Sequence, residues 1–226
     1  MASAGSGSGS RSEKVRVWDL PTRLFHWLLV GLFAFMWYSG GASDELMHWH
    51  MRAGYTLLAL LIFRVLWGLW GSRHSRFVSF VAPPRRVWGY ARAVLARRVT
   101  PASGHNPLGG WMVLVLLASL LTQTVTGLFS SDDISIDGPL NNTVSSATAG
   151  WLTSVHHLNF DLLLILAGVH IAAVLAHRVL GEPLTLAMIT GRKRAAAGDT
   201  DEPFAPLWRA LLLALAAGTA VWLVVG

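Results

Sequence analysis

The sequence predicts an all-α integral membrane protein with five transmembrane helices, and three observations support this fold class. Only 13% of the 226 residues are charged, about half of the ~25% found in soluble domains. Hydrophobic residues make up 53% of the chain, and the mean hydropathy is +0.49. Five apolar segments approach the roughly 20 residues that cross the hydrocarbon core of a bilayer.

The five segments are bounded by interfacial signals. Pro21 and Thr22 allow the first helix to begin slightly before its apolar run. Several of the eleven tryptophans lie at segment ends, as in the aromatic belts of membrane proteins. The segments cover about residues 24–40, 52–71, 111–129, 157–179 and 207–225.

The N-terminal tail does not have the pattern of a signal peptide, and the absence of cysteine excludes several kinds of site. Residues 1–14 are rich in Gly and Ser and lack the apolar run of a signal peptide, so we expect a flexible tail outside the fold. The chain has no cysteine. Disulfides, iron–sulfur clusters, thiolate zinc sites and covalent c-type haem attachment are therefore excluded.

The distribution of positive charge predicts the topology. The net charge of +6 is compatible with nucleic-acid binding, but Lys and Arg gather before the first segment, in the 72–110 loop and after the fourth segment. The loops 41–51 and 130–156 contain neither Lys nor Arg. The positive-inside rule places the N-terminus in the cytoplasm and the C-terminus outside. The two outer loops instead carry acidic residues: Asp44, Glu45, Asp132, Asp133 and Asp137.

The basic 72–110 loop has two alternative interpretations. Residues 83–95 have the pattern of a short amphipathic helix lying on the inner membrane surface. A solvated loop is the other interpretation. His74 and His105, which lie in this loop, are expected to be solvated in either case.

The spacing of histidines in the fourth segment places two of them on one face. His156 and His170 are fourteen residues apart, which at ~100° per residue brings them within about 40° of each other. Their separation along the axis is ~21 Å, so they lie at two depths. His157 lies roughly 140° from His170 and is not the co-facial partner.

Matching depths on other segments predicts two histidine pairs. His26, near the inner end of the first segment, has the depth of His170, whereas His50 has the depth of His156. His48 faces away from His50, so only one of these two can be a ligand. Imidazole is a common axial ligand of haem iron, and helical bundles hold cofactors between facing helices. Two bis-histidine iron sites, His26 with His170 and His50 with His156, would link the two membrane faces.

Two arginines and one more histidine are candidate partners of such cofactors. Arg52 lies next to the outer pair, and Arg64 lies near the inner end of the second segment. Both are candidate partners of haem propionates, which need a cation in a low dielectric. Snorkelling to the interface is the alternative for Arg64. His177 is either an interfacial residue or a contact of a propionate or quinone. Gly54, one turn after His50, would let a flat macrocycle approach the helix.

Several motifs in order resemble the bacterial cytochrome b561 family, which includes the b-type haem subunits that anchor nickel–iron hydrogenases. The opening run from Val17 to Trp27 resembles its first signature, and the 50–55 and 63–67 segments resemble its second helix. Residues 104–111 and 126–129 resemble its third helix. The His156-His157 pair, Gly168-Val169-His170 and the 191–194 run resemble its fourth.

The resemblance implies a four-helix di-haem transmembrane bundle over residues 15–194, with its ligands at His26, His50, His156 and His170. It leaves residues 195–226, a linker and the additional C-terminal transmembrane helix, unaccounted for. It implies electron transport through two haem b groups between a membrane quinone (ubiquinone or menaquinone) and a redox partner. We expect that partner to be a periplasmic c-type cytochrome or a hydrogenase-like subunit. We expect no nucleic-acid partner.

A stand-alone superoxide:quinone oxidoreductase is the alternative function. A cationic funnel around Arg52 would favour it. The acidic outer loops oppose the attraction of an anion and suit the docking of a basic cytochrome better.

Overall fold

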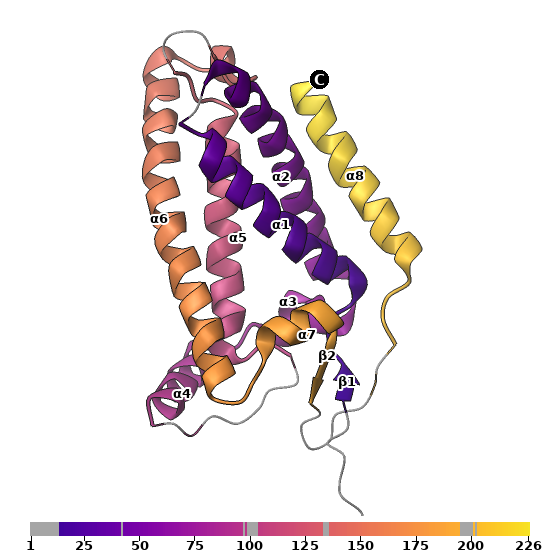
Figure 1. The fold of residues 1–226 in the computed structure, drawn as a ribbon. Coiled ribbons are helices and arrows are strands. Elements are labelled where there is room, and N and C mark those ends of the chain that lie inside the picture. Colours follow the sequence, from indigo (N-terminus) through magenta and orange to yellow (C-terminus); the bar gives the residue numbers. More distant parts are fainter. Residues whose placement is uncertain are drawn as a thin grey trace, which may run out of the picture.

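The computed structural model describes residues 14–41, 43–96, 98, 104–132, 136–194, 201 and 203–226. Most of the expected 1–14 tail, together with Asp133, lies outside these residues. Figure 1 shows long helices running side by side, with short elements gathered at one end. The long helices are α1 (Leu20–Ser39), α2 (Asp44–Trp70), α5 (Pro107–Gly127), α6 (Ser146–Val179) and α8 (Leu207–Val225).

The predicted all-α membrane fold is confirmed, because these five described helices are long and apolar enough to cross a membrane. Two helices extend beyond the predicted apolar segments: α2 begins eight residues before its segment and α6 eleven residues before. Hydropathy marks the part of a helix that lies in hydrocarbon, whereas a helix can continue into the interface, where side-chain caps or water satisfy its terminal backbone groups. Ser145 caps α6 by accepting a hydrogen bond from the Thr148 backbone N–H at 3.2 Å.

Helix α2 lies at the centre of the packing. It packs against α1, α5 and α8, while α6 packs mainly against α5. The core between these helices contains fully buried side chains of α2 and α6: Leu61, Trp67 and Leu163. Helix α8 packs on α2 through three buried residues, Ala210, Ala217 and Val221. In Figure 1, α8 and α6 lie on opposite sides of the bundle.

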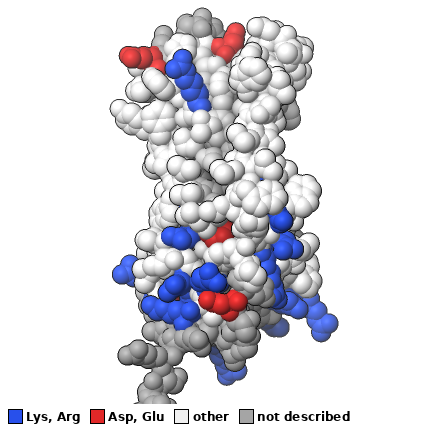
Figure 2. Space-filling model, turned by 90° about the vertical axis from the view of Figure 1, so that its right-hand side faces the viewer, with Lys and Arg blue, Asp and Glu red and all other residues white. Residues whose placement is uncertain are grey.

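The short elements lie at one end of the bundle, which we call the basic end. They are β1 (Lys14–Arg16), η1 (Arg73–Ser75), α3 (Phe77–Phe80), α4 (Pro84–Leu95), α7 (Leu184–Thr190) and β2 (Arg192–Arg194). Strands β1 and β2 pair antiparallel, with Val15 opposite Lys193. Of the two interpretations of the 72–110 loop, the amphipathic helix is the correct one, and it is present as α4. Figure 2 shows that Lys and Arg gather at this end, below a nearly uncharged band.

The opposite, acidic end contains the α1–α2 connection and the α5–α6 connection. The latter holds a short helical turn, η2 (Asn141–Thr143), and a bridge between Ser131 and Asp137. Glu45, Asp132 and Asp137 lie at this end. The two ends differ in charge as the sequence predicts.

A buried polar network joins α1, α2 and η1 at the basic end. Asp19 caps α1 by accepting a hydrogen bond from the Thr22 backbone N–H at 2.8 Å. Its other oxygen accepts from Trp67 Nε1 at 3.0 Å and from Ser75 Oγ at 3.2 Å. Asp19 is only 1% exposed, so these three donors satisfy a carboxylate that would otherwise be costly to bury. The network fixes α1 against the end of α2.

Candidate functional site

The structure brings the four predicted histidines together in two pairs. His26 of α1 and His170 of α6 lie close enough to interact electrostatically at the basic end. His50 of α2 and His156 of α6 do so at the acidic end. The rejected neighbours, His48 and His157, are exposed. Each pair therefore joins two different helices at its own depth.

The helices that carry each pair are not the ones that pack most closely. The main interfaces are α1 with α2, α2 with α5, α2 with α8, and α5 with α6. The two histidines of the basic-end pair instead lie on α1 and α6, and those of the acidic-end pair lie on α2 and α6. Between the two levels, α1 and α6 meet through the rings of Phe33 and Phe160, whose centroids are 6.4 Å apart. This arrangement suits a group that is held between helices rather than a helix–helix contact.

At the acidic end, both histidines use Nδ1 for a contact with the protein. Nδ1 of His156 donates to the Gln123 carbonyl at 2.9 Å. Nδ1 of His50 lies 3.1 Å from Ser39 Oγ. Histidines that bind a metal commonly do this, because the bond on one nitrogen fixes the ring while the other nitrogen coordinates. The donor set at this level therefore fits two Nε2 ligands.

Two glycines make room for the rings of this pair. A Cβ on Gly40 would lie 3.3 Å from Cε1 of His50, and a Cβ on Gly127 would lie 3.0 Å from Cε1 of His156. Neither glycine was expected from the sequence to have this role. Gly54, which was expected to let a flat macrocycle approach, lies where an added Cβ would meet only Met36 Cε at 3.6 Å.

At the basic end, Nδ1 of His26 is buried and has no hydrogen-bond partner in the part of the chain that the structure describes. A buried polar atom without a partner is costly. Nδ1 of His26 is therefore left without a hydrogen bond, at the depth where His170 lies nearby. This pair, too, fits a group that takes imidazole ligands.

The two arginines have different environments. Arg52 is exposed, and its guanidinium lies 5.0 Å from the ring centroid of Trp49. Arg64 is 3% exposed, so the snorkelling alternative was wrong. It donates to the Ser75 carbonyl at 3.2 Å and lies over the ring of Phe77. The polar network around Asp19 and Ser75 keeps this cation inside the bundle.

The expectation that His105 is solvated was wrong. Its ring contacts Trp18 and Phe80 at centroid distances of 4.6 and 4.5 Å, and its Nδ1 is buried without a hydrogen bond to any described residue. Burial, and then the nearby charges of Arg64 and Lys193, lower the pKa of His105 to about 3. The ring is therefore neutral. His74, also expected to be solvated, is half-buried beside Gly104.

A second cluster of polar side chains lies at the basic end, around His177. Its Nδ1 lies 2.9 Å from Glu182 Oε2, and its Nε2 lies 3.3 Å from Asn106 Nδ2. The other oxygen of Glu182 is buried without a hydrogen bond and lies 3.8 Å from Lys193 Nζ. The hydroxyl of Tyr90 is also buried and unpartnered among the described residues, and burial, then the charge of Glu182, raises its pKa.

Tyr90, Glu182 and Lys193 were not expected in this group from the sequence. They come from α4, the turn after α6 and β2. Only tertiary structure brings these elements together, and no spacing in the sequence marks them.

The four predicted histidines lie together as two pairs. Among the described residues, no three His, Asp or Glu side chains lie together as a metal-binding group. A haem iron needs only two protein ligands, because the porphyrin supplies the other four nitrogens. The fold and the paired imidazoles are those of a helical membrane protein that holds a prosthetic group between its helices.

The chain belongs to the prokaryotic cytochrome b561 family, whose profile matches residues 17–191. A protein of Bradyrhizobium diazoefficiens described as a "Probable Ni/Fe-hydrogenase B-type cytochrome subunit" is 25% identical over 230 residues, covering 85% of this chain and 92% of that protein. The "Probable Ni/Fe-hydrogenase 1 B-type cytochrome subunit" of Escherichia coli K12 is 29% identical over 116 residues, covering 41% of this chain and 49% of that protein. No solved structure shows a significant match.

Family membership confirms the coarse function that the sequence predicted. The chain is a multi-pass bacterial membrane protein that binds haem b and transfers electrons across the membrane.

Proposed function

We propose that the chain transfers electrons through two haem b groups between a membrane quinone and a redox partner on the periplasmic side. The observation that carries this proposal is the pair of imidazoles at each of two depths, His26 with His170 and His50 with His156. When bound, each haem iron supplies a one-electron redox centre. The four-helix part, residues 15–194, would hold both groups.

The protein's part is to hold, orient and shield these groups. The Gln123 carbonyl and Ser39 Oγ orient the acidic-end imidazoles through Nδ1. Arg64, buried at the basic end, is the cation that we propose for a propionate, because both Arg64 and His170 interact electrostatically with His105. Arg52 is the corresponding candidate at the acidic end, where its exposed position suits a propionate at the membrane surface.

The basic end has the features that we expect of a quinone site. Reduction of a quinone takes up protons as well as electrons, so the site needs polar groups beside an otherwise apolar wall. Unpartnered buried atoms of His105 and Tyr90 lie at this end, along with the contact between His177 and Glu182. The positive-inside rule places the basic end in the cytoplasm, and the C-terminus then lies in the periplasm.

The acidic end suits a positively charged or hydrogenase-like partner. Glu45, Asp132 and Asp137 lie there and would attract a basic surface, such as that of a c-type cytochrome, and repel an anion such as superoxide. The two relatives are named as cytochrome subunits of hydrogenases, which supports a partner of that kind.

Two measurements test the proposal. A reduced-minus-oxidised optical spectrum with haem quantitation should show b-type bands and two haems per purified chain. No b-type bands, or a single haem per chain, would contradict the two-haem arrangement. Stopped-flow mixing should then show rapid exchange with a c-type cytochrome that slows with salt. Faster reaction with superoxide than with the cytochrome would favour the stand-alone oxidoreductase.

A further inference from the structure

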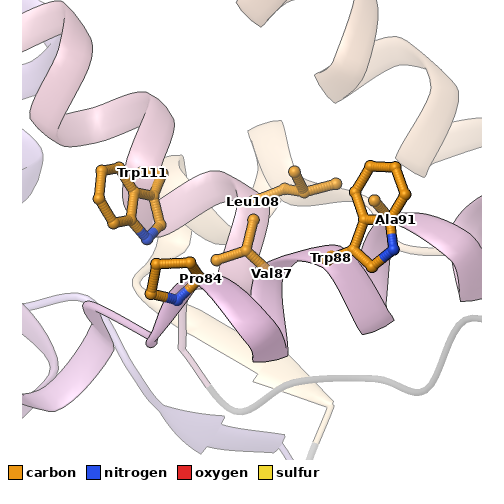
Figure 3. Close-up of a pocket in the computed structure, with 6 residues that line it drawn as sticks. All are labelled: Pro84, Val87, Trp88, Ala91, Leu108 and Trp111. Carbon is orange, nitrogen blue, oxygen red and sulfur yellow. The ribbon is translucent and has the colours of Figure 1, made fainter.

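An apolar groove lies between the amphipathic helix α4 and the start of α5 (Figure 3). Four of its lining residues share one face of α4, because they are spaced three or four residues apart. The figure shows Leu108 of α5 above this face, with Trp88 and Trp111 toward the two ends of the groove. The lining residues are Pro84, Val87, Trp88, Ala91, Leu108 and Trp111.

The groove continues into the lipid-facing side of α5. Leu108 and Trp111 begin a stripe of exposed apolar residues at helical spacing that continues with Val115 and Ala118. An exposed apolar stripe on a membrane-spanning helix faces acyl chains. A chain that lies in the groove can therefore extend along α5 without leaving apolar surroundings.

Positive charge flanks one edge of the groove. Arg85 and Arg92 are seven residues apart and each follows a groove residue of α4, so they lie on the same side of the helix, about 10.5 Å apart along its axis. Both are exposed, and neither forms an ion pair with a described acidic residue. Arg86 is on the opposite side of α4, about 150° from the centre of the groove face.

We propose that this groove binds an acyl chain of an anionic phospholipid, whose phosphate is held by Arg85 and Arg92. An in-plane helix with an apolar face and basic flanks is the geometry that anionic lipid surfaces attract. The isoprenoid tail of a quinone would also suit the apolar lining. Its headgroup, however, is uncharged and offers the two arginines no anionic partner, so charge complementarity favours the phospholipid.

Native mass spectrometry of the purified full chain tests the site with phosphatidylglycerol and phosphatidylethanolamine as probes. The wild-type protein should retain phosphatidylglycerol in preference to phosphatidylethanolamine. Replacing Arg85→Gln and Arg92→Gln together should lower the retained phosphatidylglycerol about tenfold. The matched variant Arg86→Gln, which changes the same charge on the other side of α4, should retain it like the wild type.

A second variant tests the groove itself. Ala91→Trp fills the groove and should reduce retention of phosphatidylglycerol, whereas Gly89→Trp, at a position with open space around it, should not. Equal phosphatidylglycerol retention by the wild type and the double arginine variant would overturn the proposal. So would unchanged retention in Ala91→Trp, or a co-purified quinone that phosphatidylglycerol does not displace. These outcomes do not depend on how many haems the chain binds.

Discussion

At the scale of single residues, the glycines beside the acidic-end histidines set the space for the imidazole rings. Gly127→Ala would place a methyl group 3.0 Å from Cε1 of His156, closer than most packed carbons lie. We expect this variant to shift the ring and to lower haem occupancy at the acidic end. Gly150→Ala, a helical position with nothing within 4 Å, is the control. Haem quantitation and electron paramagnetic resonance check the result, and equal occupancy in both variants would contradict it.

Asp19 stabilises the junction between α1, α2 and η1. Asp19→Ala removes the cap of α1 and leaves the buried donors of Trp67 and Ser75 without their acceptor. We expect the free energy of unfolding to fall by about 3 kcal/mol, from a lost cap and unsatisfied buried donors. Denaturant unfolding in detergent measures this change. Asp161→Ala, an exposed carboxylate on α6, should change the value little, and a comparable loss there would argue against the network.

His105 makes the stability depend on pH. Its pKa in the folded chain is about 3, below the ordinary value of 6.5, because the ring is buried. Between these two values the unfolded chain binds a proton at this position and the folded chain does not, so stability falls as the pH is lowered from 6.5 toward 3. The unfolding temperature can be measured at about pH 7.5, above this range, and at about pH 5.5, within it. His105→Phe should reduce the difference, and an unchanged difference would show that His105 does not contribute.

At the scale of the elements, hydropathy predicted which segments cross the membrane but not where two of the helices begin. The first turns of α2 and α6 carry polar residues that the interface solvates, so no hydrophobic signal marks them. Both His50 and His156 consequently lie inside helices rather than at their ends. The amphipathic pattern of residues 83–95 was sufficient to suggest α4 but not to exclude a loop.

Helix α8 is packed against α2, away from the histidine pairs. Its buried face is made of small and β-branched residues, Ala210, Ala217 and Val221, and Ser72 Oγ accepts a hydrogen bond from Ala205 N just before the helix. We predict that a chain ending at residue 194 keeps both proposed haems, because none of the four proposed ligands lies beyond that point. Its unfolding temperature should fall, since one face of α2 loses its partner. Loss of either haem on truncation, measured by haem quantitation, would show that α8 belongs to the cofactor-binding unit.

At the scale of the whole molecule, the sequence was sufficient to predict the two histidine levels but not their surroundings. Helical periodicity and the depth of each segment select His26, His50, His156 and His170, because both follow from position along the chain. The polar network around Asp19 and the group around His105 depend on contacts between α1, η1, β2 and the α6–α7 turn. Such contacts arise only when the bundle closes, so composition and spacing do not mark them. Asp19 before Pro21 has the pattern of a helix N-cap, but this pattern does not indicate the contacts of Asp19 with Trp67 and Ser75.

Haem quantitation on single-ligand variants tests the pairing of the four histidines most directly. His26→Ala and His170→Ala should each leave one haem per chain, with the same spectrum and the same midpoint potential in both variants. His50→Ala and His156→Ala should likewise agree with each other and retain the other haem. The pairing would be contradicted if His26→Ala and His170→Ala removed different haems, or if any of these variants retained both.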